Sequence, residues 1–159
     1  MDNTLNTEHL DISLQEVPGH LSLCMWLSGC GNKCKGCSTP ELQGNGGIRI
    51  GFDDFKSLLK TKGKGCSCIC FLAGDKQKAL LNFAEEAKNQ GFKTAVYTGS
   101  DIIPDNYIQH FDYIKYGSWN ENLGPLTSLT TNQKMIRTDI MEDITYEFQR
   151  TIEPTYAAK

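Results

Sequence analysis

The chain has 159 residues, a length typical of one domain with a hydrophobic core of its own. Its formal net charge of −3 gives no general attraction for nucleic acid or for an anionic membrane, so neither is expected as a partner. An odd number of cysteines, seven, without a secretory signal argues against a disulfide framework and favours a reducing, cytoplasmic location. We expect a single domain over 1–159, with a lead-in segment at 1–20 and a flexible tail at 151–159.

The first strongly apolar run, 21–27, alternates and is rich in bulky residues, which predicts a buried strand. Within the lead-in segment, residues 10–17 are compatible with an edge strand that ends before Pro18-Gly19. A glycine-rich stretch, 28–37, follows the buried strand and contains three cysteines. These cysteines are therefore expected in a loop at the carboxyl end of a strand, the rim where parallel α/β architectures bind ligands.

The three cysteines, Cys30, Cys34 and Cys37, have the spacing C-x3-C-x2-C, which suits a thiophilic centre, either zinc or an iron–sulfur cluster. A structural zinc site usually has four protein ligands, and no neighbouring histidine completes the set here. Three thiolates on a [4Fe–4S] cluster leave one iron open, in the same sense as the open position of catalytic zinc. Zinc completed by a distant cysteine and ordinary packing cysteines remain the alternatives.

Downstream of the loop, strand and helix patterns alternate. A glycine-rich loop at 39–50 is followed by an amphipathic helix at 51–62, whose lysine-rich end reads as a solvated helix terminus. The next strand is expected at 66–73, where Cys66, Cys68 and Cys70 alternate and are interpreted as packing residues on one face.

Asp75 is expected to cap a helix that runs to Gln90. Further strands are predicted at 92–97 and 111–116, so that Lys115 would emerge near a strand end.

The remainder is mostly polar. A loop without secondary structure is expected at 117–133, and a loop of this length is more often functional than a spacer. Trp119 within it is a candidate anchor for a partner protein. A weak last strand is expected at 143–148. Because strands and helices alternate but the chain is too short for a full eight-unit barrel, we expect an α/β fold. Its form would be an incomplete open (β/α) barrel of about five to six mostly parallel strands.

The cysteine spacing, placed after a strand and Ser28-Gly29, resembles the signature of the radical S-adenosylmethionine (SAM) enzymes. The short chain and the sequence around Cys30 and Cys34-Lys35-Gly36-Cys37 resemble those of the activating proteins of anaerobic (class III) ribonucleotide reductase. Most radical SAM loops have an aromatic residue before the third cysteine, near the adenine, whereas Gly36 stands here, as in the activase subgroup. Ala73-Gly74-Asp75 stands where the family has a Gly-Gly-Glu-like motif that holds the SAM amino group. The segment 130–133 also resembles one found in the activases.

The resemblance implies a radical SAM barrel with one [4Fe–4S] cluster on the three cysteines and SAM on the fourth iron. It implies reductive cleavage of SAM and formation of a glycyl radical on the large subunit of anaerobic ribonucleotide reductase, with electrons from a flavodoxin- or ferredoxin-type donor. The rival functions are another small radical SAM enzyme, acting on a different glycyl-radical protein or a small molecule, and a structural zinc module. The candidate SAM contacts are Gly36, Ser38, Ala73, Gly74, Asp75, Thr98 and Lys115.

Overall fold

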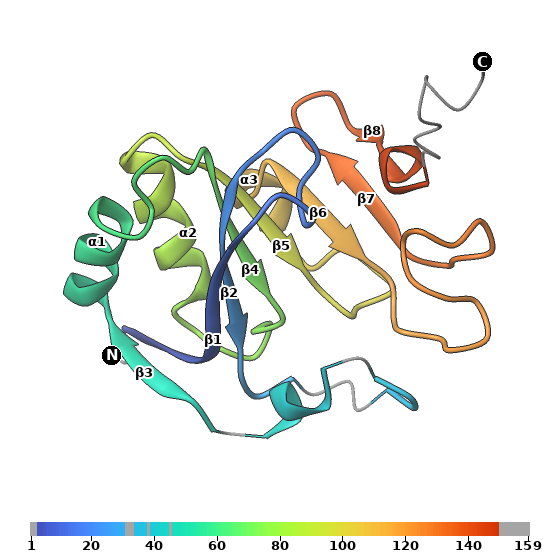
Figure 1. Cartoon of the computed structure of the whole chain (residues 1–159), viewed down its shortest axis with the longest axis horizontal. Helices are drawn as coiled ribbons and strands as arrows, with labels where there is room; N and C mark the ends of the chain where they lie inside the picture. The colour runs from blue at the N-terminus through green and yellow to red at the C-terminus, as the bar shows by residue number, and fades with distance from the viewer. Residues whose placement is uncertain (1–2, 31–33, 38, 45, 150–159) are drawn as a thin grey trace, which may run out of the picture.

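The computed structural model describes residues 3–30, 34–37, 39–44 and 46–149. Its centre is one eight-stranded sheet with the order β3-β1-β2-β4-β5-β6-β7-β8 (Figure 1). The strands are β1 (Thr4–Ser13), β2 (Ser22–Leu27), β3 (Ile48–Gly51), β4 (Cys68–Leu72), β5 (Lys93–Tyr97), β6 (Tyr113–Tyr116), β7 (Lys134–Arg137) and β8 (Glu142–Asp143). The helices are α1 (Phe52–Lys60), α2 (Leu80–Asn89), α3 (Tyr107–His110) and the 3₁₀ turns η1 (Pro40–Gln43) and η2 (Thr145–Phe148).

The expected incomplete (β/α) barrel of radical SAM type is wrong. The sheet is open and mixed, and four of its seven strand pairings are antiparallel. Parallel pairing is confined to the central strands β2, β4, β5 and β6. In the described part of the chain there are three α-helices, and the longest has ten residues. The strand–helix alternation that predicted a barrel holds only for this centre, and antiparallel strands extend the sheet on both sides of it.

Several elements differ from the sequence predictions because long-range pairing decided them. The lead-in segment contributes β1, an inner strand between β3 and β2, and not an edge strand at 10–17. The predicted loop at 39–50 contains η1 and most of β3. The predicted strand at 143–148 is largely the turn η2. The strands and the helix predicted between residues 21 and 73, and those at 92–97 and 111–116, are present with shorter bounds, and the expected tail at 151–159 lies outside the described residues.

The two faces of the sheet are covered differently. Helices α1, α2 and α3 pack on one face, where side chains such as Phe55, Phe71 and Phe83 form the main core. The other face is covered by connecting segments, through Val17 after β1 and Leu126 after β6. The cysteine loop (residues 28–37) begins at the carboxyl end of β2, at the edge of the sheet where the other parallel strands also end (Figure 1).

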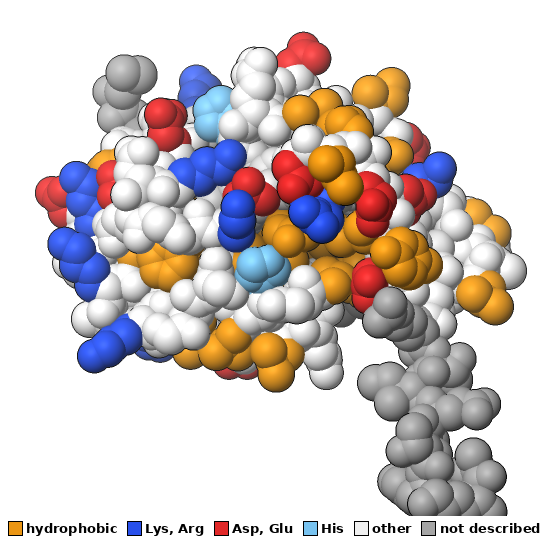
Figure 2. Space-filling model, turned by 90° about the horizontal axis from the view of Figure 1, so that it is seen from above, with side chains coloured by type: hydrophobic (Ala, Val, Ile, Leu, Met, Phe, Trp, Pro, Cys, Tyr) orange, Lys and Arg blue, Asp and Glu red, His pale blue; other side chains and the backbone are white. Residues whose placement is uncertain are grey.

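The end of the molecule away from the cysteine loop has a mixed surface. Figure 2 shows acidic and basic side chains intermixed there, with hydrophobic side chains between them. Among the described residues, no helix has the length and apolar composition needed to cross a bilayer.

Candidate functional site

The cysteine loop is fixed at its start by backbone hydrogen bonds. The Ser28 amide donates to the carbonyl of Asn6 in β1 at 3.1 Å, and the Cys30 amide donates to the carbonyl of Leu42 in η1 at 2.7 Å. At its end, the Cys37 amide donates to the Cys34 carbonyl at 3.2 Å, which closes a tight turn between two of the cysteines. Strand β1 and turn η1 therefore hold the loop against the end of β2.

A cavity of about 420 Å³ lies beside the cysteine loop. This volume falls within the range of about 300–1,000 Å³ that is usual for small-molecule sites. Six of the candidate cluster ligands and SAM contacts line it together, from four separate segments of the chain. They are Cys30, Cys34, Cys37, Ala73, Thr98 and Lys115.

The other candidates do not line this cavity in the same way. Gly36 lies between two lining cysteines, but a Cβ at this position would point toward the Glu121 side chain. Gly74 is buried, and a side chain there would overlap Leu27. Asp75 is exposed beside the cavity, and Ser38 lies outside the described residues. The structure thus brings the three cysteines, one cation and the ends of β4 and β5 to a common space.

Lys115 is the cation of the site. Its ammonium lies 5.5 Å from the centre of the Tyr97 ring, and no hydrogen bond or ion pair to another described residue engages it. Desolvation lowers the pKa of Lys115 from 10.5 to about 8, while the nearby charges of Cys34 and Asp75 oppose this shift. A partly buried ammonium without a paired anion is suited to bind a ligand carboxylate.

Asp75 does not cap α2 as predicted, because both of its carboxylate oxygens are used elsewhere. Thr98 Oγ1 donates to one oxygen at 2.8 Å, and Tyr107 Oη donates to the other at 2.5 Å. Burial and the Asp75 charge raise the pKa of Tyr107, which keeps its hydroxyl protonated as a donor. Helix α2 starts later, with Ala79 as the preceding residue and no side-chain cap. Asp75 therefore connects the ends of β4 and β5 to α3.

The backbone at Ala73-Gly74 has an uncommon conformation. Ala73 has φ +66° and Gly74 has φ +91°, and the Ala73 amide donates to the Tyr97 carbonyl at 2.9 Å. Left-handed backbone is unfavourable for an alanine, since its Cβ crowds the following carbonyl. The conformation turns the chain sharply after β4 and exposes Ala73 to the cavity.

The remaining cysteines divide into two groups. Cys68 and Cys70 are fully buried with Cys24, as expected for packing residues, and burial raises the pKa of Cys68 to about 12. A thiol that stays protonated is a poor metal ligand. Cys66 precedes β4 and packs against the helix-side core, so the prediction that it shares a face with the other two is wrong.

Two cavity residues were not recognised as ligand contacts from the sequence. Glu16 Oε2 and Trp119 Nε1 are buried and have no hydrogen-bond partner among the described residues, and both residues line the cavity. Glu16 was part of a polar lead-in with no distinguishing pattern, and Trp119 was interpreted as a partner anchor. No sequence signal separates an acidic loop residue that faces a cavity from one that faces water.

The donor set fits a thiophilic group, since three cysteines from one short loop face one cavity. Within the described ranges, no three histidine, cysteine or acidic side chains form a group positioned to hold a metal ion. Comparisons with protein-family models, with curated proteins and with solved structures found no match to this chain.

Proposed function

We propose that this chain is a radical SAM activase, which cleaves SAM reductively and generates a glycyl radical on anaerobic ribonucleotide reductase. The observation that carries the proposal is that Cys30, Cys34 and Cys37 share one cavity with the Lys115 ammonium, which has no anionic partner in the described part of the chain. The proposal does not depend on a barrel. It depends on the ligands and charges at the ends of the parallel strands.

The three cysteine thiolates would hold a [4Fe–4S] cluster through three of its irons. When bound and reduced, the cluster supplies the electron that splits SAM into methionine and a 5′-deoxyadenosyl radical. Lys115 would bind the SAM carboxylate, and its charge also offsets the negative charge of the thiolates. Backbone groups of the sharp turn at Ala73 would bind the SAM amino group beside it.

The cavity is of a size for SAM, so the glycine to be activated would belong to a second protein. We propose the large subunit of anaerobic ribonucleotide reductase as that protein and a flavodoxin- or ferredoxin-type protein as the electron donor. The three-cysteine loop supplies ligands for a single cluster, so electrons must be delivered from outside the chain.

The test is anaerobic reconstitution of the full chain with iron and sulfide, followed by incubation with dithionite and SAM. We expect roughly four irons and four sulfides per chain, as a [4Fe–4S] cluster requires. Release of 5′-deoxyadenosine would report SAM cleavage, and a glycyl-radical EPR doublet should appear only when the reductase is added. Stoichiometric zinc in place of iron and sulfide would refute the proposal.

Cys34→Ala should lose the cluster and abolish formation of 5′-deoxyadenosine, because it removes one of the three thiolates. The matched control is Cys66→Ala, which removes a half-exposed cysteine outside the loop and should retain both. Full 5′-deoxyadenosine production by Cys34→Ala would contradict the assignment. Radical formation on a different glycyl-radical protein, or turnover of a free metabolite, would replace the named substrate.

A further inference from the structure

Two polar side-chain atoms at the cavity are buried and have no hydrogen-bond partner among the described residues. In the described part of the chain, five buried side-chain nitrogen or oxygen atoms lack a hydrogen-bond partner. Glu16 Oε2 and Trp119 Nε1 are two of them, and they alone belong to residues that line the cavity. Burying a carboxylate oxygen or an indole N–H without a partner is unfavourable, so a cavity that keeps both is suited to a ligand that pairs them.

The backbone of both residues is held in place. The Glu16 carbonyl accepts a hydrogen bond from Tyr97 Oη at 2.5 Å, and the next residue, Val17, is fully buried against the sheet. Trp119 follows Ser118, whose amide and hydroxyl donate to Asp101 at 2.9 and 3.0 Å. Both residues therefore line the cavity from anchored backbone, one in the segment after β1 and one in the segment after β6.

The chemistry of the two groups differs from that of the cysteine end. The Lys115 ammonium matches the carboxylate in the amino-acid half of SAM. A carboxylate acceptor and an indole donor match the other half, because a nucleoside offers ribose hydroxyls as donors and ring nitrogens as acceptors. The aromatic and aliphatic side chains of Trp26, Leu72 and Leu126 line the same cavity and are suited to contact a purine.

We propose that Glu16 and Trp119 bind the nucleoside half of SAM. The Glu16 carboxylate accepts hydrogen bonds from the ribose hydroxyls, and Trp119 Nε1 donates to an adenine ring nitrogen. This inference rests on the proposed function, since it assigns residues to the same cofactor. It gives a binding role to a residue of the N-terminal lead-in and to the long segment between β6 and β7.

The experiment measures binding to the reconstituted full chain under anaerobic conditions, without turnover. Equilibrium dialysis would use two fragments of SAM: 5′-methylthioadenosine for the nucleoside half and methionine for the amino-acid half. We expect Glu16→Gln to weaken binding of 5′-methylthioadenosine by about tenfold or more, and Trp119→Phe by about three- to tenfold. Binding of methionine should stay unchanged in both variants.

A modified ligand tests the contact to the ribose directly. The 2′-deoxy form of 5′-methylthioadenosine should bind wild type more weakly, and this loss should shrink in Glu16→Gln because the two changes remove the same hydrogen bond. The matched control is Glu85→Gln, on the exposed side of α2, which should bind both ligands like wild type.

The outcomes separate this inference from the function on which it rests. If wild type binds the nucleoside fragment and both variants bind it equally well, the assignment of Glu16 and Trp119 is overturned and the proposed function stands. If the variants lose both fragments to the same degree, the residues are structural and the assignment is again overturned. If wild type binds neither SAM nor the fragments, the proposed function and this inference fail together.

Discussion

At Gly36 the cysteine loop passes through a left-handed conformation, with φ +69°, and packs against the side chain of Glu121. A Cβ at this position would overlap the Glu121 carboxylate, which also pairs with the exposed Lys35 at 3.7 Å. An aromatic residue here would be strained by its backbone and would displace Glu121. This gives a physical reason why glycine, and not an aromatic residue, occupies position 36 in this loop.

Gly36→Ala should therefore lower the free energy of unfolding by about 1–2 kcal/mol, chiefly because L-residues disfavour positive φ. Gly19→Ala isolates this backbone effect, since Gly19 has φ +80° and no atom within 4 Å of the added Cβ. The Glu121 carboxylate is the flexible end of a side chain, so the two alanine variants should agree within about 0.5 kcal/mol. Gly36→Tyr should be clearly less stable than either in urea denaturation, and wild-type stability of that variant would disprove the explanation.

Among the elements, the connection from β4 to α2 is tied to the cysteine loop by one side chain, Gln77. Its Oε1 accepts from the Asn6 amide at 2.8 Å, and its Nε2 donates to the carbonyls of Asn6 at 3.0 Å and Ser28 at 2.9 Å. Gln77 thus links β1 and the end of β2 to the segment that follows the Ala73-Gly74 turn. Ser28 is buried and lies two residues before Cys30, so this link sets where the loop begins.

Gln77→Ala should lower the free energy of unfolding by about 2–3 kcal/mol, because it breaks three hydrogen bonds and leaves backbone groups unpaired. Gln90→Ala is the control, since Gln90 makes one side-chain bond, to Glu86 at 2.9 Å near the end of α2, and should cost below about 0.5 kcal/mol. Hydrogen exchange should also become faster at the Ser28 amide in Gln77→Ala. Equal stability of the two variants would show that the side chain does not tie these elements together.

For the molecule as a whole, the sequence predicted what local patterns determine. The apolar run before Cys30 and the spacing of the cysteines predicted a strand and a loop at its carboxyl end, and both are present. The mixed sheet was missed because β1 and β7 owe their places to pairing with distant strands, and neither has a strong pattern of its own. The role of Asp75 was missed for a similar reason, since its partners Thr98 and Tyr107 come from later segments.

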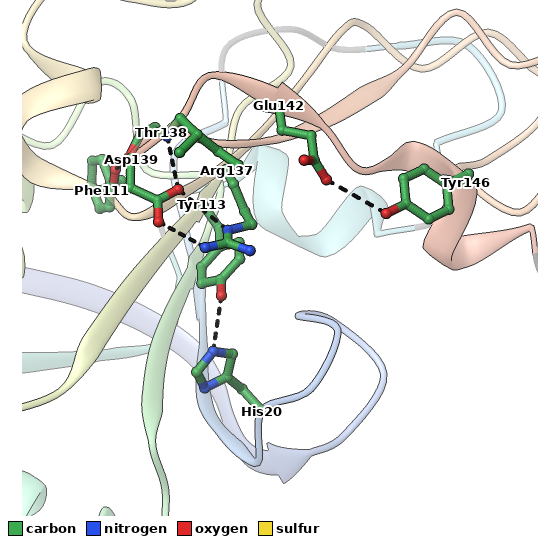
Figure 3. Close-up of polar contacts among 9 residues, drawn as sticks. His20, Phe111, Tyr113, Arg137, Thr138, Asp139, Glu142 and Tyr146 are labelled. Carbon is green, nitrogen blue, oxygen red and sulfur yellow. Dashed lines mark hydrogen bonds and ion pairs between the residues drawn. The ribbon is translucent and has the colours of Figure 1, made fainter.

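The segment that carries Glu16 to the cavity is held at its other end by His20. His20 Nε2 lies 3.0 Å from Tyr113 Oη (Figure 3). His20 Nδ1 lies 2.7 Å from Ser67 Oγ. Desolvation lowers the pKa of His20 below 6.5, Lys93 lowers it further, and Asp112 opposes the shift. The native state therefore favours the neutral imidazole, whose two nitrogens both have partners in this structure.

This shift predicts how the stability of the molecule depends on pH. Above the ordinary pKa of 6.5, His20 is neutral in both the native and the unfolded state, and its contribution to stability is fully present. As the pH falls below 6.5, the unfolded chain takes up the proton more readily, so stability is lost until the pH passes the lower native pKa. His20→Gln should be less stable than wild type near pH 8, through loss of these contacts, and the difference should shrink toward about pH 5. Urea denaturation across this range measures the difference, which should be constant above about pH 7.5, where neither state of wild type is protonated at His20. A difference that stays constant down to about pH 5 would mean that proton uptake at His20 is not coupled to folding.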